Sequence, residues 1–231
     1  SNENQQVTNV EEASLFLGLS RISELIIATP IIEEIQAFGK NATLVNWTEF
    51  WRHSIGSAIM TRELLAAADI QWEDEGDYVA GLVHNLGKII MAVTFPDQFG
   101  QLCENTADQT EDICEQERDL LGWDHAKMGA FYLWNHHIAP EIVEATQYHN
   151  VPQEAPSHSK LTAAVQLADH MVRTAGIQGI EKVRPASKNK WPELTGWDIL
   201  FGEDETLSEE ERLNDLEETL ERVTGTLRGI V

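Results

Sequence analysis

The chain has 231 residues, of which 42% are apolar and 24% charged, values typical of a globular protein that buries a sizeable core. Its formal net charge of −23 repels phosphate backbones and anionic membrane surfaces, which argues against nucleic-acid and membrane partners. No apolar run reaches the ~20 residues that span a bilayer, no signal peptide is visible, and Cys103 and Cys114 are expected to be reduced thiols. We therefore expect a cytoplasmic protein, and we exclude membrane proteins and disulfide-stapled mini-proteins.

Apolar residues recur at helical spacing from the N-terminus onward, and no alternating run bounded by hairpin turns occurs in the sequence. A first periodic stretch runs from Val10 to Ile31. Thr48 predicts the N-cap of a long helix that ends at the alanines 66–68. Residues 74–83 are apolar on almost all sides, which is typical of a helix in the middle of a bundle. These features predict an all-α fold, a multi-helix bundle.

Four further helices are predicted downstream from their capping and breaking residues. Asp124 is the expected N-cap of one of them, and Pro140 lies at the start of another, where its missing N–H costs nothing. The predicted ranges are 110–122, 124–134, 140–149 and, from either Ser157 or Ser159, onward to Gly176.

The C-terminal region, residues 177–231, differs in composition from the predicted core of residues 10–176. Residues 179–202 contain prolines, lysines and two tryptophans, and we interpret them as an irregular connection. Beyond it, Ser208 and Glu211 form a predicted capping box. Apolar residues then recur at spacings of three and four: Leu213, Leu216, Leu220, Val223, Leu227 and Ile230. We predict an amphipathic C-terminal helix that packs on the core with its acids in water; a coiled-coil seam is the alternative.

The eight histidines fall into two classes according to the residues that share their helical faces. His53, for example, shares its face with the small residues Gly56 and Ser57. The histidines predicted to point inward are His53, His84, His125 and His149. Those predicted to lie in turns or on polar faces are His136, His137, His158 and His170.

One acid, Asp169, joins the inward group because Val165 and Val172 flank it at helical spacing. A buried carboxylate is costly unless a cation, a metal or several hydrogen-bond donors pair with it. Four imidazoles and one carboxylate on five helices can converge on iron, manganese or zinc. The alternative is that each group is a core polar residue with an internal hydrogen-bond partner.

A set of ordered motifs between Val10 and Ala175 resembles a known family. The segment 81–88, Gly-Leu-Val-His-Asn-Leu-Gly-Lys, resembles the His-Asp-(Ile/Leu)-Gly-Lys signature of the HD phosphohydrolase superfamily. Four further segments resemble successive elements of its HDOD branch, the HD-related output domains of bacterial signalling proteins. They are 51–54, 117–130, 134–149 and 168–169.

The resemblance implies a set of metal ligands. By position they are His53, His84, Asn85 and Asp169, with His125 and His149 near a second metal site. Asn85 stands where the family signature has an aspartate, and asparagine brings no charge and cannot bridge two cations. The implied cofactor is therefore at most an iron, manganese or other divalent ion at low occupancy. The His-His-Glu and Gly-Tyr-Pro elements of the cyclic-dinucleotide phosphodiesterases are missing from the corresponding segment, 148–156.

The resemblance also implies a bacterial signalling domain with little or no hydrolase activity, which acts through protein partners. Relatives carry a further helical lobe before the equivalent of Val10, and an apolar patch left without that lobe would favour a homodimer. One alternative is a metal-dependent phosphohydrolase in which Lys88 contacts phosphate, although Lys88 also fits an ordinary surface lysine. The other is a purely structural bundle.

Overall fold

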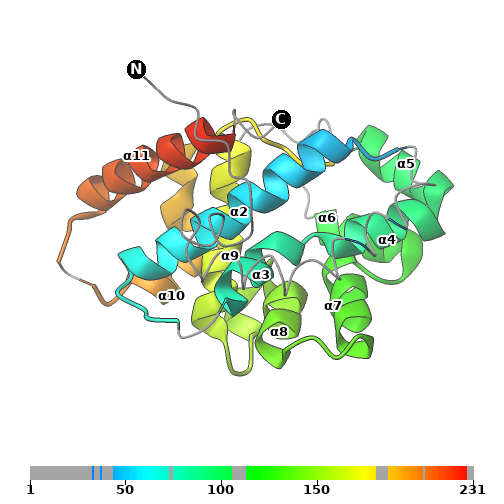
Figure 1. Cartoon of the computed structure of the whole chain (residues 1–231), viewed down its shortest axis with the longest axis horizontal. Helices are drawn as coiled ribbons and strands as arrows, with labels where there is room; N and C mark the ends of the chain where they lie inside the picture. Colours follow the sequence, from blue (N-terminus) through cyan, green and yellow to red (C-terminus); the bar gives the residue numbers. More distant parts are fainter. Residues whose placement is uncertain are drawn as a thin grey trace, which may run out of the picture.

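The described residues form α-helices and two short 3-10 helices, and they contain no strand (Figure 1). The computed structural model describes residues 33, 37, 44–72, 75–105, 113–180, 187–204 and 206–227. The α-helices in chain order are α2 (Trp47–Ala67), α3 (Gly76–Val83), α4 (Leu86–Thr94), α5 (Pro96–Asn105), α6 (Ile113–Leu121), α7 (His125–Asn135), α8 (Pro140–Tyr148), α9 (Ser159–Thr174), α10 (Thr195–Phe201) and α11 (Glu209–Leu227). The 3-10 helices are η2 (Pro152–Glu154) and η3 (Lys188–Glu193). The predicted all-α bundle is confirmed, while the predicted stretch from Val10 to Ile31 lies outside the described residues.

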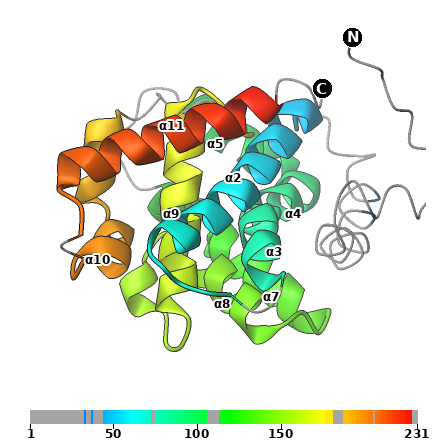
Figure 2. The same cartoon turned by 60° about the vertical axis from the view of Figure 1, so that its left-hand side comes forward.

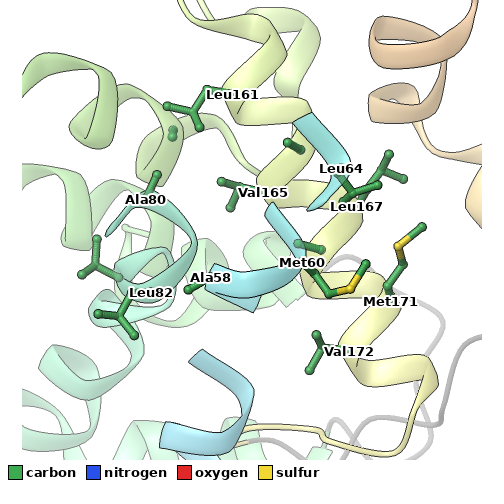
Figure 3. Close-up of a cluster of buried hydrophobic side chains, with 14 of the residues drawn as sticks. Ala58, Met60, Leu64, Ala80, Leu82, Leu161, Val165, Leu167, Met171 and Val172 are labelled. Atoms are coloured by element: carbon green, nitrogen blue, oxygen red, sulfur yellow. The ribbon is translucent and has the colours of Figure 1, made fainter. Parts of the chain in front are cut away.

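The centre of the bundle is the contact between α2 and α9, with α3 packed against both helices. Figure 3 shows Met60 and Leu64 of α2 facing Leu167 and Met171 of α9, and all four side chains are buried. Burying a Leu or Met side chain contributes roughly 1.5–3 kcal/mol, so this contact is a main source of stability. It also fixes the relative position of two helices that are far apart in the sequence.

Two glycines allow helices to approach closely around the centre of the bundle. A Cβ on Gly81 of α3 would lie 2.7 Å from the Cα of Ala58 in α2. A Cβ on Gly87 of α4 would lie only 1.8 Å from the carbonyl oxygen of His125, the first residue of α7. Contacts this short exclude any side chain, so α4 and the start of α7 meet backbone to backbone.

The helix ends agree with the sequence prediction at several caps and differ at one. Asp124 caps α7, because its carboxylate accepts a hydrogen bond from the Lys127 N–H at 2.8 Å, and Pro140 is the first residue of α8. The predicted cap at Thr48 is wrong. The N-cap of α2 is Asn46, whose side-chain oxygen accepts from the Glu49 N–H at 3.2 Å. The helix predicted over 110–122 is described from Ile113, and residues 106–112 lie outside the described residues.

The predicted irregular connection over 179–202 contains two ordered elements, η3 and α10. Trp191 and Trp197 are buried in the common core, and Gly196 donates its backbone N–H to the Gln166 side chain at 2.8 Å. Helix α10 has seven residues, about two turns, and so few residues show no recognisable apolar period. The prediction of an irregular segment was therefore wrong for 188–201.

Helix α11 lies across α2 and α9 on one side of the bundle (Figure 2). Its residues Leu216, Leu220, Val223 and Leu227 are buried, Leu213 is partly buried, and Ile230 lies outside the described residues. The capping box is present, since Glu211 accepts from the Ser208 N–H at 2.9 Å. Among the described helices, none taken singly is long and apolar enough to cross a membrane, and one bent pair, 76–94 with 96–104, matches on length and composition alone.

Candidate functional site

Four predicted ligand residues meet in the interior where α2, α3, α4 and α9 come together. We call His53, His84, Asn85 and Asp169 the first cluster; all four are buried. The Nε2 atom of His53 lies 2.8 Å from Oδ1 of Asp169, and the Nε2 atom of His84 lies 3.2 Å from the same oxygen. The sequence therefore identified side chains that the fold brings together from residues 53 to 169.

The outer ring nitrogens of the two histidines face backbone carbonyls. Nδ1 of His53 lies 2.9 Å from the carbonyl oxygen of Ile177, and Nδ1 of His84 lies 2.8 Å from that of Gly81. A carbonyl only accepts, so both Nδ1 atoms carry the proton. In neutral rings, both Nε2 lone pairs then point towards the Asp169 carboxylate. Burial lowers the pKa of His84 and outweighs the opposing effect of Asp169, which favours the neutral form of this ring.

Asn85 places its amide among these lone pairs. Its Nδ2 atom lies 2.7 Å from Nε2 of His84 and 3.4 Å from Nε2 of His53, so the amide donates to the His84 ring. The Oδ1 atom of Asn85 is buried and has no hydrogen-bond partner among the described residues. An aspartate at this position would have no proton to donate at neutral pH. The asparagine therefore satisfies a histidine lone pair without a cation.

Asp169 is paired with a residue that the sequence analysis did not select, Arg173. The Nε atom of Arg173 lies 3.1 Å from Oδ1 of Asp169, and Nη2 of Arg173 contacts Oδ2, so the pair is bidentate. Burial raises the pKa of Asp169, but the charge of Arg173, followed by the contacts with the His53 and His84 rings, outweighs it and holds that pKa well below its usual value. Asp169 is thus a carboxylate with a cation already beside it.

The first cluster fits a metal ion in geometry but not in charge. Ligands bound at about 2.0–2.2 Å from a metal lie about 3 Å apart, which matches the distances from Asp169 Oδ1 to the two Nε2 atoms, 2.8 and 3.2 Å. However, the guanidinium of Arg173 already pairs with the charge of Asp169, and neither Asn85 nor a neutral His84 ring adds a negative charge. A divalent ion would have no net negative charge to compensate it, so these residues do not suit the metal that an aspartate at position 85 would hold.

A second cluster contains His125, His149, Glu117 and Asn150. Oε2 of Glu117 accepts from the backbone N–H of His125 at 2.8 Å and from its Nδ1 at 2.6 Å. Nδ1 of His149 donates to the Thr146 carbonyl at 2.8 Å, and the Nε2 atoms of His125 and His149 lie 3.3 Å apart. The Asn150 amide lies 3.0 Å from Nε2 of His149 and donates to it.

The two clusters are continuous, because the rings of His84 and His149 are 5.1 Å apart between centroids. Burial, followed by the charges of His84 and His125, holds the pKa of His149 well below its usual value. Cys114, Glu117 and His125 also bring ligand-type atoms within 4.8 Å of one another. Sequence reasoning did not select Cys114 as a ligand and used Glu117 only as part of a motif, although both share a face of α6 at a spacing of three.

The remaining predicted residues lie outside these clusters. His136 and His137 are exposed, while His158 and His170 are partly buried and belong to neither group of converging ligand atoms. The interpretation of Lys88 as a surface lysine is wrong, because only 3% of this residue is exposed. Helix α4 is buried along most of its length, and Lys88 is buried with it.

Exposed aromatic side chains gather on α7 and the turn before it. We call Trp123, Phe131 and Trp134 the aromatic surface; they are 40%, 59% and 64% exposed. The Trp123 and Phe131 rings are 5.7 Å apart between centroids. The three residues line a hollow of about 270 Å³ together with Lys127, Ala130, Val143 and Gln147. Exposed apolar groupings of this kind mark interaction sites.

A comparison with family models identifies one family. A sequence model of the HDOD domain matches residues 2–152. An uncharacterized protein of Treponema pallidum (strain Nichols) is 21% identical over 174 residues, which span 74% of this chain and 32% of that protein. The chain therefore spans about a third of the length of this curated relative.

Solved structures share the fold at low sequence identity. An HDOD domain protein with unknown function from Geobacter sulfurreducens has a TM-score of 0.77 and 18% identity, over 97% of this chain and 75% of that one. A "putative phosphohydrolase" from Shewanella amazonensis SB2B has a TM-score of 0.70 and 22% identity, over 97% and 77%. A "putative signal transduction protein" from Marinobacter aquaeolei VT8 has a TM-score of 0.60 and 20% identity, over 78% and 38%.

Proposed function

Because this chain belongs to the HDOD family, we propose that it is a bacterial signal-transduction domain that acts through protein contacts and does not hydrolyse phosphoesters. The observation that carries this proposal is the Asn85 amide, which donates to Nε2 of His84 at 2.7 Å where the family signature has an aspartate. The cluster is thereby a hydrogen-bonded core rather than a metal centre.

The energetic argument concerns uncompensated charge. Two unit charges 4 Å apart interact with about 4 kcal/mol at the effective dielectric of about 20 that suits protein sites. An aspartate at position 85 would attract a cation with a term of this size, and Asn85 does not supply it. Within the described part of the chain, Glu117 meets His125 at Nδ1, and the Nε2 atoms of His125 and His149 face each other, so this cluster disfavours a second ion even more strongly.

Two further observations support a signalling role through protein contacts. The neighbour from Marinobacter aquaeolei VT8 is named as a signal transduction protein, while that from Geobacter sulfurreducens has no stated function. On this chain, Trp134 and Phe131 are more than half exposed beside a hollow. Tryptophan is enriched among the residues that contribute most to protein–protein affinity. The aromatic surface is thus the part of this domain best suited to a protein partner.

Metal analysis tests the degenerate site. Untagged protein purified without chelator is expected to contain far less than one iron or manganese per chain by elemental analysis. Asn85→Asp is expected to raise that occupancy, because it restores a charge beside His53 and His84. Two stoichiometric metals in the natural sequence, together with hydrolysis of a generic phosphodiester, would overturn the proposal.

Partner capture tests the protein contacts. Proteins retained from a bacterial lysate by the natural chain are expected to be lost with Trp134→Ala. They are expected to stay bound to Leu207→Ala, which truncates another exposed apolar residue away from the aromatic surface. Equal retention by both variants would remove the aromatic surface from the proposal.

The alternative function is a metal-dependent phosphohydrolase, and one observation favours it. Nε2 of His53, Nε2 of His84 and Oδ1 of Asp169 form a compact group of buried ligand-type atoms. The Shewanella amazonensis SB2B neighbour is named as a phosphohydrolase, which is a statement about that protein. Turnover of a phosphoester by the natural chain with Mn²⁺, abolished by His84→Ala, would favour this alternative.

A further inference from the structure

We propose that Arg173 is a built-in counter-ion that replaces a metal cation at Asp169 and keeps divalent ions out of the first cluster. This inference rests on the proposed function. It gives a second reason, besides Asn85, why the first cluster excludes a metal ion. The two causes are separable, because Asn85 acts on His84 whereas Arg173 acts on Asp169.

The geometry of Arg173 is that of a specific ion pair rather than a passing surface contact. Asp169 and Arg173 are four residues apart on α9, so their side chains lie on one face of the same helix. Two guanidinium nitrogens contact the two carboxylate oxygens, and only 15% of the Arg173 side chain is exposed. A rigid helix thus holds both partners in place, and the planar guanidinium matches the carboxylate.

The contacts around Asp169 show why a cation is needed there. Its side chain is 2% exposed, and it faces two imidazoles whose outer nitrogens donate to backbone carbonyls. An unpaired carboxylate in such surroundings is unfavourable. In a metal centre the ion would supply the positive charge, whereas here the guanidinium supplies it from inside the chain. A divalent ion would therefore have to enter against the charge of Arg173.

The same end of α9 also closes the cluster on the His53 side. The turn after the helix supplies the Ile177 carbonyl that accepts from His53. In this turn, a Cβ added to Gly179 would lie 3.2 Å from Cγ of the His53 ring, so the backbone lies directly on that ring. Arg173 and the turn thus come from one continuous segment, which pairs the acid and fixes the histidine.

The test uses Mn²⁺ alone as the probe and the full chain as the protein. Metal-free Arg173→Gln is expected to unfold at a lower temperature than the natural chain, and added Mn²⁺ is expected to recover part of that loss. Calorimetry is expected to show that Arg173→Gln binds Mn²⁺ at least about tenfold more tightly than the natural chain does, because removing one unit charge at about 4 Å and an effective dielectric of about 20 changes the interaction by more than about 1.4 kcal/mol. Arg173→Lys keeps a charge and is expected to gain less.

A matched control is available elsewhere in the chain. Arg62 makes a bidentate pair with Asp77 through contacts of 3.0 and 2.7 Å, away from both histidine clusters. Arg62→Gln is expected to lower the unfolding temperature without any recovery by Mn²⁺. The double variant Asp169→Asn with Arg173→Gln is also expected to show no Mn²⁺ effect, because the carboxylate ligand is gone.

The outcomes separate this inference from the proposed function. If neither the natural chain nor Arg173→Gln binds Mn²⁺, the counter-ion inference is wrong while the metal-free signalling domain stands. If the natural chain already binds Mn²⁺ as tightly as Arg173→Gln, both are wrong. Should Arg173→Gln fail to fold without metal, refolding yield with and without Mn²⁺ gives the answer: a yield restored by Mn²⁺ supports the inference, and an unchanged yield refutes it.

Discussion

The two histidine clusters differ in the side of the ring on which their carboxylate lies. In the first cluster, Asp169 faces the Nε2 atoms of His53 and His84, and backbone carbonyls take the Nδ1 atoms. In the second, Glu117 lies behind His125 at Nδ1, and no carboxylate faces its Nε2 atom among the described residues. The same residue types thus place a carboxylate at the Nε2 side of the imidazoles in one cluster and at the Nδ1 side of an imidazole in the other.

This difference shows that the content of histidines and acids does not define a metal site. The decisive feature is which ring nitrogen the backbone occupies, because that choice determines where the lone pair of a neutral imidazole points. In the second cluster, both Nε2 atoms face each other at 3.3 Å, and the Asn150 amide donates to one of them. The first cluster is therefore the one in which charge decides whether a metal ion binds.

The largest expected effect comes from removing the acid of the first cluster. Asp169→Asn removes the carboxylate charge that faces the mostly buried Arg173 guanidinium, and breaking a buried pair costs about 3–5 kcal/mol. We expect the free energy of unfolding, measured by urea denaturation, to fall by that amount. The corresponding change Asp77→Asn is expected to cost less, because its partner Arg62 is 35% exposed and water can solvate it. Equal losses for the two variants would contradict this account.

A smaller effect is expected for the acid of the second cluster. Glu117→Gln keeps an oxygen that can accept from the backbone N–H of His125, and it loses the charge behind the ring. The expected loss in the free energy of unfolding is about 1–3 kcal/mol, the range for a weakened bond to a charged group. A loss as large as that of Asp169→Asn would show that the Glu117 carboxylate contributes as much to stability as the Asp169 carboxylate.

A third carboxylate–histidine pair gives a more exposed reference. Burial raises the pKa of Glu144, but the N–H groups of His158 and Ser157 and the His158 ring outweigh it and lower the pKa overall. A lowered carboxyl pKa stabilises the fold above the unfolded value, near 4.5, and this stability is lost as the pH falls through the folded pKa. Glu144→Gln keeps an acceptor oxygen but loses the charge, and it is expected to cost about 1 kcal/mol at pH 7, the typical size of one hydrogen-bond contribution.

The pH dependence of that cost is the measurement that checks it. Urea denaturation of the natural chain and of Glu144→Gln at several pH values is expected to give a difference that is constant between pH 7 and 5. Below the unfolded pKa the difference is expected to shrink. A difference that stays constant down to pH 3 would mean that the charge of Glu144 contributes nothing.

Helical spacing predicted the inner face of the histidine helices well. It placed His53, His84, His125 and His149 inside, because neighbours three and four residues away report the direction of a side chain. The same rule applies to Arg173, which was not among the residues selected from the sequence. Arg173 lies four residues after Asp169, so helical spacing predicts this ion pair. The polar residues on the same face of α9 made the pair hard to recognise.

Other features could not be obtained from local patterns. The contact between Gly87 and the His125 carbonyl depends on how α4 meets α7, and nothing in either segment specifies that crossing. The buried position of Lys88 depends on the elements that cover α4. Which ring nitrogen of His53 meets a carbonyl was also hidden, since Ile177 is 124 residues away along the chain.

The position of α9 has a consequence for how this domain is divided into pieces. The family match ends at residue 152, yet Asp169 and Ile177, which contact the two ring nitrogens of His53, both come after that point. The largest packing partner of α2 is α9 as well. A fragment cut at the end of the family match would keep the signature motif while losing half of the core around it. We therefore expect the cooperative folding unit to be longer than the segment that the family model matches, and any excised or transplanted version has to include the C-terminal helices.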